Sequence, residues 1–131
     1  MKVRKEITVA LENAPGRLGH LCCCLAAKKV NILAISVVET ANVGLVRMVV
    51  DKPDAAVKMI GECCPMTVST TDVLQLSAPN RPGALACIAS RLGKKRINVD
   101  YVYGSAARGG KAAIILRPSN IKKAMRLLRG M

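Results

Sequence analysis

The sequence predicts an α+β protein made of two small βαββαβ units, each an antiparallel sheet with both helices on one face. The motif Asn-x-Pro-Gly-x-Leu occurs at residues 13–18 and again at 80–85. When the chain is shifted so that the two motifs coincide, further residues match, and the pairs are Leu25 with Leu92, Lys28 with Lys95 and Asn31 with Asn98. Such self-similarity indicates two copies of one unit, which we assign to residues 1–71 and 72–131.

The first copy begins with residues 7–11, where apolar side chains alternate with polar or small ones as in a half-buried strand. After the motif, apolar residues recur at the i, i+3, i+4 and i+7 positions of a helix, namely Leu18, Leu21, Cys22 and Leu25. Strands over residues 30–39 and 44–51 follow. A helix over 54–61, opened by a proline and an aspartate, and a strand near 66–69 complete the unit.

The second copy repeats this order. Residues 74–77 alternate as a strand, and the next helix has its apolar stripe at Leu85, Ile88, Ala89 and Leu92. Strands over 97–104 and 111–117 and a helix over 120–129 follow, and no last strand comes after them. The edge of this copy's first strand therefore needs cover from a partner chain or from residues 2–5. The order of elements is that of a ferredoxin-like fold.

The composition predicts an aliphatic core and a basic surface. Hydrophobic residues make up 51% of the chain but aromatic residues only 2%, with no Trp and no Phe. The net charge of +13, from 21 Lys and Arg against 8 Asp and Glu, attracts phosphate, nucleic acid or an acidic partner. The longest apolar run, residues 21–27, is far shorter than the roughly 20 residues of a membrane span. Because Glu6 interrupts any secretory signal, we expect a cytoplasmic protein with no membrane contact.

Six cysteines and a single histidine, His20, limit the chemistry that the chain can support. Cys22 to Cys24 are consecutive, so on a helix they point about 100° apart and cannot all face one metal ion. No Cys-x-x-Cys spacing exists, and we interpret the cysteines as small buried apolar residues in a reducing compartment. A metal or redox site would require Cys63 and Cys64 to reach the helix of the cysteine triplet. Since the carboxylates do not cluster either, we predict no metal site, no cofactor and no enzyme activity.

Two explanations fit the repeated turn. As a helix start, its proline suits the first helical turn and its asparagine can cap free amides. Its glycine costs about 1 kcal/mol relative to alanine inside a helix, and the space that it leaves over the free helix amides suits an anion. We therefore interpret the glycine as room for a ligand. The residues concerned are Asn13, Pro15, Gly16, Arg17 and Leu18 in the first copy, and Asn80, Pro82, Gly83, Ala84 and Leu85 in the second.

A further asparagine in each copy, Asn31 or Asn98, stands at the start of the second strand. A small zwitterion needs donors for its carboxylate and acceptors for its ammonium group. A helix N-terminus supplies the first, while an asparagine side chain and backbone carbonyls supply the second. These asparagines favour the ligand explanation, and the helix cap stays an alternative.

The strings ENAPGRL and LCCCLAAKKVNIL together resemble the start of an ACT domain, a small regulatory module that binds amino acids. PNRPGAL and IASRLGKKRINVD resemble a second one. The resemblance covers nearly the whole chain and is closest to the stand-alone proteins with two ACT copies and no catalytic domain. It implies a non-enzymatic regulator, a homodimer or higher homo-oligomer, that binds a free amino acid and signals to a partner enzyme or regulator.

The resemblance also implies where the amino acid binds, because ACT modules pair edge to edge through their second strands and hold the ligand at that seam. The serine-sensing module of phosphoglycerate dehydrogenase uses the motif His-Glu-Asn-x-Pro-Gly and the asparagine that opens the second strand. By position, the matching asparagines of this chain are Asn13, Asn31, Asn80 and Asn98. Leu11 and Ala78 stand at the histidine position. The resemblance therefore implies an amino acid without singling out serine.

The rival hypothesis is a nucleic-acid-binding or purely protein-interaction module of the same fold. RNA-binding sheets stack bases on aromatic side chains, and this chain offers only Tyr101 and Tyr103. The basic residues of the helix at 120–129 are typical of a solvated face. We therefore do not expect a nucleic-acid partner.

Overall fold

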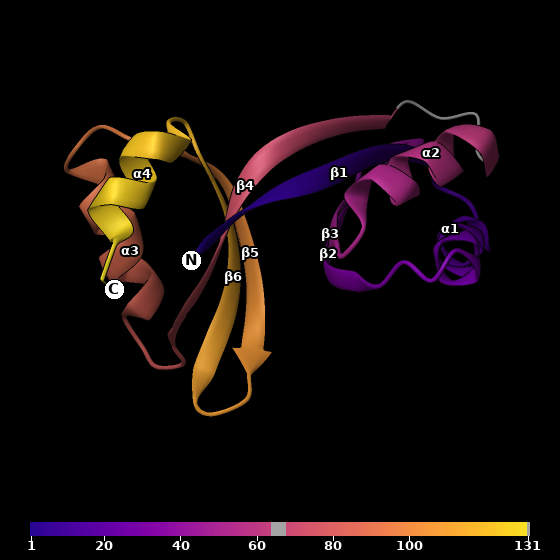
Figure 1. Cartoon of the computed structure of the whole chain (residues 1–131). Coiled ribbons are helices and arrows are strands. Elements are labelled where there is room, and N and C mark those ends of the chain that lie inside the picture. Colours follow the sequence, from indigo (N-terminus) through magenta and orange to yellow (C-terminus); the bar gives the residue numbers. More distant parts are fainter. Residues whose placement is uncertain (64–67, 131) are drawn as a thin grey trace. The chain divides into compact units, whose positions relative to one another are not determined.

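The structure, a computed structural model, describes residues 1–63 and 68–130 (Figure 1). Its elements are β1 (Lys2–Glu12), α1 (Arg17–Ala27), β2 (Ile32–Glu39), β3 (Val43–Val50), α2 (Pro53–Cys63), β4 (Val68–Pro79), α3 (Ala84–Gly93), β5 (Val99–Ala107), β6 (Lys111–Pro118) and α4 (Ile121–Leu128). The predicted α+β class with βαββαβ repeats is confirmed. The strand predicted near residues 66–69 corresponds from Val68 onward to the start of β4, and its earlier part lies outside the described residues.

The chain folds into two compact units. Lys5–Thr71 form the N-terminal unit, and Met1–Arg4 together with Asp72–Met131 form the C-terminal unit. Each of β1 and β4 therefore contributes one part to each unit.

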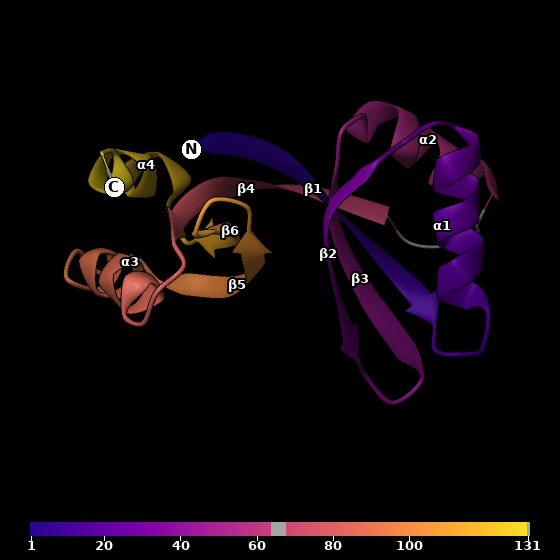
Figure 2. The same ribbon diagram turned by 90° about the horizontal axis from the view of Figure 1, so that it is seen from below.

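In the N-terminal unit the strand order is β2-β3-β1-β4, and α1 and α2 cover one face of the sheet (Figure 2). β1 pairs antiparallel with β3, which places Ile7 opposite Met48 and Val9 opposite Val46. These side chains are completely buried, and Leu21 of α1 belongs to the same core. The apolar positions of the first predicted strand thus face the helices.

In the C-terminal unit the strand order is β1-β4-β6-β5, and α3 and α4 cover one face of the sheet (Figure 1). β4 pairs antiparallel with β6, with Leu74 opposite Leu116 and Leu76 opposite Ile114. All four join a core that includes Ile88 of α3. The residues described after α4 add no further strand, as predicted.

The first residues of the chain cover the edge that a last strand of the second copy would have covered. β1 is the neighbour of β4 in the strand order, and Met1–Arg4 belong to the C-terminal unit. Arg4 Nε donates a hydrogen bond of 2.8 Å to Gln75 Oε1 on β4. Of the two covers expected for this edge, the structure shows the N-terminal segment, which occupies backbone groups that could otherwise pair with another chain.

Both cores are aliphatic, as the composition predicts, and consist of Leu, Ile, Val, Met and Ala side chains. The helices are short, with 11 residues in α1 and α2, 10 in α3 and 8 in α4. Within residues 1–63 and 68–130, none of them is long and apolar enough to cross a membrane.

Candidate functional site

The two Asn-x-Pro-Gly turns adopt the same backbone. α1 starts at Arg17 and α3 at Ala84, so Gly16 and Gly83 are helix caps and lie outside the helices. Their φ angles are +83° and +88°, in the left-handed region that glycine adopts without strain. The prediction of a glycine inside the first helical turn is therefore wrong. The backbone conformation is a sufficient reason for glycine, so the glycine itself is no evidence for a ligand.

Asn13 and Asn80 are not the helix caps that the alternative explanation assumed, because the N-cap positions are Gly16 and Gly83, three residues further on. The asparagine backbone instead joins each turn to the neighbouring hairpin. The N–H of Asn13 donates to the Asn42 carbonyl at 3.1 Å, and the N–H of Asn80 donates to the Gly110 carbonyl at 2.8 Å. The first amide of each helix donates back to its turn, at 3.4 Å in α1 and 3.3 Å in α3. The next amides of the first helical turn are left to solvent or to an anion.

A cavity of about 410 Å³ opens beside the second of these turns. It lies on the helix-covered side of β5 and β6, where the end of β4, the turn and the start of α3 form its walls. The residues from the predicted set that line it are Asn80, Ala84 and Leu85. Its volume falls within the range of about 300 to 1,000 Å³ that is usual for small-molecule sites. The turn, the helix start and the edge strand thus surround one cavity.

The cavity depends on small residues that the second copy alone carries. Ala78, Ala84 and Gly104 line it. At the same places of the repeat, the first copy has Leu11, Arg17 and Val37. Gly104 also has a packing role, since a Cβ at that position would lie 2.5 Å from the carbonyl oxygen of Ala113 on β6. The first copy therefore places bulkier side chains around the same backbone.

Arg17 makes the difference between the turns larger. Its guanidinium lies 3.1 Å from the carboxylate of Glu12, with both side chains more than half exposed. In the second copy the two corresponding residues are Ala84 and Pro79, which both line the cavity. The first turn is thus flanked by an ion pair, whereas the second is flanked by two uncharged residues that line the cavity.

A larger cavity of about 480 Å³ shares Ala78 and Pro79 with the first and is also lined by Met1 and the β5–β6 turn. It contains neither Asn80 nor any residue of α3. Because it offers no helix amides to a carboxylate, we do not treat it as the site.

Asn98 does not reach the 410 Å³ cavity from its own unit. It precedes β5, whose first residue, Val99, pairs with Pro118, whereas Asn80 bonds to Gly110 at the other end of the hairpin. β5 has 9 residues, so at about 3.3 Å per residue the two asparagines lie roughly 30 Å apart. One free amino acid cannot contact both.

Other partners fix the asparagines that open the second strands. The N–H of Asn98 donates to Ser119 Oγ at 2.9 Å, and its side-chain Nδ2 donates to Asp100 Oδ1 at 3.0 Å. The N–H of Asn31 donates to Asp51 Oδ1 at 2.9 Å. The structure therefore brings the predicted residues of each turn together and holds Asn31 and Asn98 at the opposite ends of their sheets.

A comparison of the whole sequence with models of protein families identifies the family of the chain. A family model described as an ACT domain pair matches residues 1–129. The chain belongs to this family. Among curated protein sequences there is no match.

Solved structures with a similar fold include the following three. Protein BT0572 of Bacteroides thetaiotaomicron is 35% identical, with a TM-score of 0.90, over 97% of this chain and 87% of that one. The ligand-free regulatory subunit of aspartate kinase from Thermus thermophilus is 13% identical, with a TM-score of 0.70, over 97% and 95%. E. coli aspartokinase III in complex with lysine and aspartate is 13% identical, with a TM-score of 0.54, over 98% of this chain and 31% of that one. At 13% identity, the likeness shows the fold alone.

Each sheet of the ACT pair ends in an edge strand with exposed apolar side chains. β2 and β5 are the outermost strands. On β2 the exposed side chains are Leu33, Ile35, Val37 and Val38, and on β5 Val102 is exposed beside the cavity. Edges of this kind can pair with a strand of another chain.

The interpretation of the cysteines as buried residues is wrong for those that the structure describes. Cys23, Cys63 and Cys87 are exposed, and Cys22 and Cys24 are half-buried; Cys64 lies outside the described residues. His20 and Cys24 are four residues apart, a spacing that places both side chains on one face of a helix and is visible in the sequence.

Proposed function

We propose that this ACT domain pair is a non-catalytic regulator that binds a free amino acid in the cavity of its second copy. We assign the two ACT domains to residues 1–71 and 72–131. One observation carries the proposal. The cavity of about 410 Å³ contains Asn80 together with Ala84 and Leu85 at the start of α3.

The start of α3 suits the carboxylate of the ligand. A helix N-terminus carries partial positive charge and unpaired N–H groups, which together favour an anion. The residue at the cap position is Gly83, which has no side chain that could bond to these amides in place of a ligand. Arg81 also lines the cavity and adds a positive charge, although its exposure to solvent weakens that contribution.

The other walls suit the rest of an amino acid. The side-chain oxygen of Asn80, which lines the cavity, is an acceptor for an ammonium group, and backbone carbonyls of the cavity wall on β5 supply further acceptors. Ala78, Ala112 and Ile114 present apolar surface to the same space. Burying a charged side chain against such walls is costly. We therefore expect an amino acid with an uncharged, aliphatic side chain.

A second copy of the chain can complete the site through Asn98. Asn80 lies at one end of β5 and Asn98 at the other. If two β5 edges pair antiparallel, the start of one strand comes next to the end of the other. Asn98 of the second copy then stands beside the cavity of the first. The exposed Val102 on this edge favours such pairing, and a homodimer is the expected assembly.

The relatives are compatible with this role. One is a regulatory subunit of aspartate kinase and another is an aspartokinase solved with lysine and aspartate bound, both with this fold. We infer from them a regulatory role for this chain, with an enzyme or another regulator as the receiver of the signal.

Binding at such a site is weak, and it acts by shifting populations. A ligand of fewer than ten or so heavy atoms, bound far below the ceiling of about 1.5 kcal/mol per atom, has a Kd of roughly micromolar to millimolar. A ligand held at the seam favours the assembled arrangement in proportion to its differential affinity for the two states. The cellular pool of the amino acid thereby sets the arrangement of the subunits.

The test is thermal unfolding of the full chain, followed by circular dichroism, in the presence of each standard amino acid. We expect a small aliphatic subset to raise the melting temperature, because a ligand that binds only the folded state stabilises it. Asn80→Ala should remove this rise, and Asn13→Ala, the same change in the first copy, should leave it in place.

Two outcomes would overturn the proposal. One is a panel with no stabilising amino acid at concentrations of up to about 10 mM, which exceeds the expected Kd. The other is loss of the rise in Asn13→Ala with its retention in Asn80→Ala, which would move the site to the first copy.

A further inference from the structure

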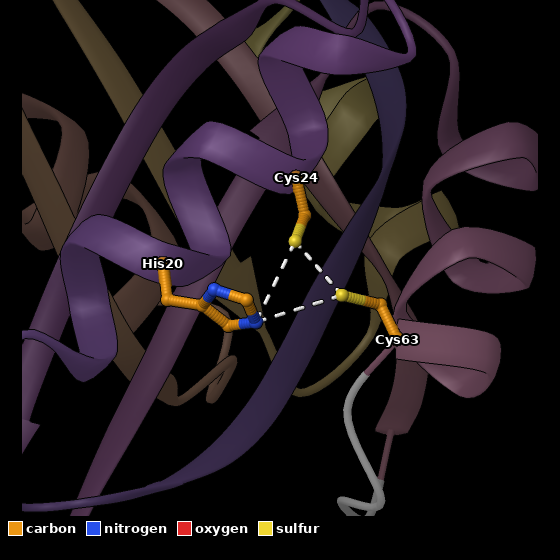
Figure 3. Close-up of side chains that lie close together, drawn as sticks. All are labelled: His20, Cys24 and Cys63. Carbon is orange, nitrogen blue, oxygen red and sulfur yellow. Dashed lines mark hydrogen bonds between the residues drawn. The ribbon is translucent and has the colours of Figure 1, made fainter.

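His20, Cys24 and Cys63 of the N-terminal unit point toward one another in a cluster of ligand atoms (Figure 3). The two Sγ atoms lie 2.8 Å apart. His20 Nε2 lies 3.7 Å from Cys24 Sγ and 3.6 Å from Cys63 Sγ. The ligand atoms of two thiols and one imidazole thus lie within 4.8 Å of one another.

The helix packing of this unit builds the cluster. His20 and Cys24 are four residues apart on α1, so they lie on one face of the helix. Cys63 is the last residue of α2. α1 packs on α2 through a shared core that includes Leu25 and Ile60. The cluster therefore joins two helices that the core already holds in place.

We propose that His20, Cys24 and Cys63 bind a thiophilic divalent metal ion of the zinc class. Zinc prefers thiolate sulfur and imidazole nitrogen, with bonds of about 2.3 Å and 2.0–2.1 Å in a tetrahedron. From those lengths, ligand atoms around one ion lie about 3.5 to 3.8 Å apart. Both sulfur–nitrogen distances already fall in this range.

The sulfur–sulfur distance of 2.8 Å must open by about 1 Å to suit such an ion. This change needs only small side-chain rotations, because His20 and Cys63 are exposed and Cys24 is half-buried. Exposure also gives the ion a path from solvent. The three residues occupy three positions of the tetrahedron, and water or an external ligand takes the fourth.

The donor set determines the class of metal. Soft thiolate ligands select zinc-like ions, whereas magnesium and calcium require oxygen ligands. Two thiolates carry two negative charges, which balance those of a divalent cation. Zinc binding displaces protons from the thiols to the solvent, and no electron is transferred.

The second copy offers a natural control. At the places of His20 and Cys24 it has Cys87 and Arg91, so the same helix face carries one thiol and a cation. The proposed site is therefore a property of the first copy alone, and it lies in the other unit from the 410 Å³ cavity.

The test uses the full chain, reduced with a phosphine, freed of metal and titrated with Co²⁺ without oxygen. We expect one cobalt per chain, with a thiolate-to-cobalt charge-transfer band and the visible bands of four-coordinate cobalt, both removed by Zn²⁺. Cys24→Ser, Cys63→Ser and His20→Ala should each weaken binding by more than about 100-fold, which exceeds the usual loss for outer-shell changes. Cys23→Ser and Cys87→Ser should bind like the parent.

Folding of each variant is checked by circular dichroism, and a second readout does not depend on cobalt. Zn²⁺ should raise the melting temperature of the parent and of Cys87→Ser but not that of Cys63→Ser. A reduced, folded parent without the charge-transfer band overturns the proposal. So does an undiminished band in Cys24→Ser and Cys63→Ser. A chain that forms a Cys24–Cys63 disulfide in air and binds no cobalt when reduced would make the cluster a redox pair instead.

Discussion

The two Asn-x-Pro-Gly turns share a backbone and differ in their surroundings. Both glycines adopt a left-handed conformation and cap a helix, and both asparagines bond to the neighbouring hairpin. The second turn opens on a cavity of about 410 Å³, while the residues on either side of the first turn, Glu12 and Arg17, form an ion pair. The repeat thus preserves the conformation that folding requires, and the side chains around it decide whether there is room for a ligand.

The helices that follow the turns show the reverse difference. α1 carries His20 and Cys24, which meet Cys63, whereas α3 has Cys87 and Arg91 at the corresponding places. The N-terminal unit therefore holds the side chains that suit a metal ion, and the C-terminal unit holds the space that suits an amino acid. The two copies of one fold have separate candidate sites.

The largest effect is expected at Gly104, which replaces the Val37 of the first copy. Gly104→Ala should lower the free energy of unfolding by about 3 kcal/mol, because its Cβ would lie 2.5 Å from a backbone oxygen. Chemical denaturation measures this. Gly44→Ala is the control, since the nearest atoms to its Cβ are at 3.6 and 3.7 Å, and it should cost under about 1 kcal/mol. Equal costs at both glycines would contradict the close approach of β5 to β6.

A smaller effect is expected when the second turn is given the side chain of the first. Ala84→Arg places a long charged side chain at the wall of the cavity. We expect the affinity for the stabilising amino acid to fall about 30-fold, or about 2 kcal/mol, as measured by titration calorimetry. The reverse change, Arg17→Ala, should leave the affinity as it is. If Ala84→Arg binds as tightly as the parent, the ligand does not occupy this cavity.

The two cap glycines should respond equally. Gly16→Ala and Gly83→Ala each force a side chain into the left-handed region, at a cost of about 1 kcal/mol. Gly19 lies inside α1 and a Cβ there meets nothing within 4 Å, so Gly19→Ala should stabilise the protein by about 0.5–1 kcal/mol. The melting temperatures of the three variants give the order. Stabilisation by Gly83→Ala would mean that the second turn does not adopt this conformation.

The smallest effect is expected for the ion pair at the first turn. Glu12→Gln removes the carboxylate beside Arg17, but both side chains are more than half exposed. Such pairs contribute about 0–1 kcal/mol. We expect the free energy of unfolding to change by less than about 0.5 kcal/mol, and this change should be smaller still at high salt because salt screens the charges. A loss above about 1 kcal/mol would show that the ion pair stabilises the turn, contrary to this expectation.

Periodicity and the internal repeat were enough to predict the order of elements, because each element has an apolar face that a single unit must bury. They could not show which end of a strand lies near which turn. Asn13 and Asn31 are close in sequence, yet Asn31 is fixed to Asp51 at the far end of the sheet. Their distance in space is set by the strand register, which the sequence does not show. For the same reason, the sequence could not decide whether Met1–Arg4 or a partner chain covers the edge of β4.

The candidate site was predictable to the level of the turn and no further. The positive φ angles of Gly16 and Gly83 are properties of the folded backbone that the sequence does not report. Each glycine could therefore also be interpreted as room for a ligand. A comparison of Leu11 with Ala78 and Arg17 with Ala84 across the repeat could have pointed to the second copy. The thiol cluster depends on the end of α2 reaching α1, which is a tertiary contact that spacing along the chain does not report.

The most direct test of the central claim is a backbone amide NMR titration of the full chain with the amino acid that stabilises it. We predict that the largest shift changes occur at Asn80, Leu85, Ala86 and Ser105, because the ligand lies against the second turn and the start of α3. The corresponding amides of the first turn, at Asn13 and Leu18, should hardly move. Equal changes at both turns, or changes confined to the first, would contradict the proposal that the ligand binds in the second copy.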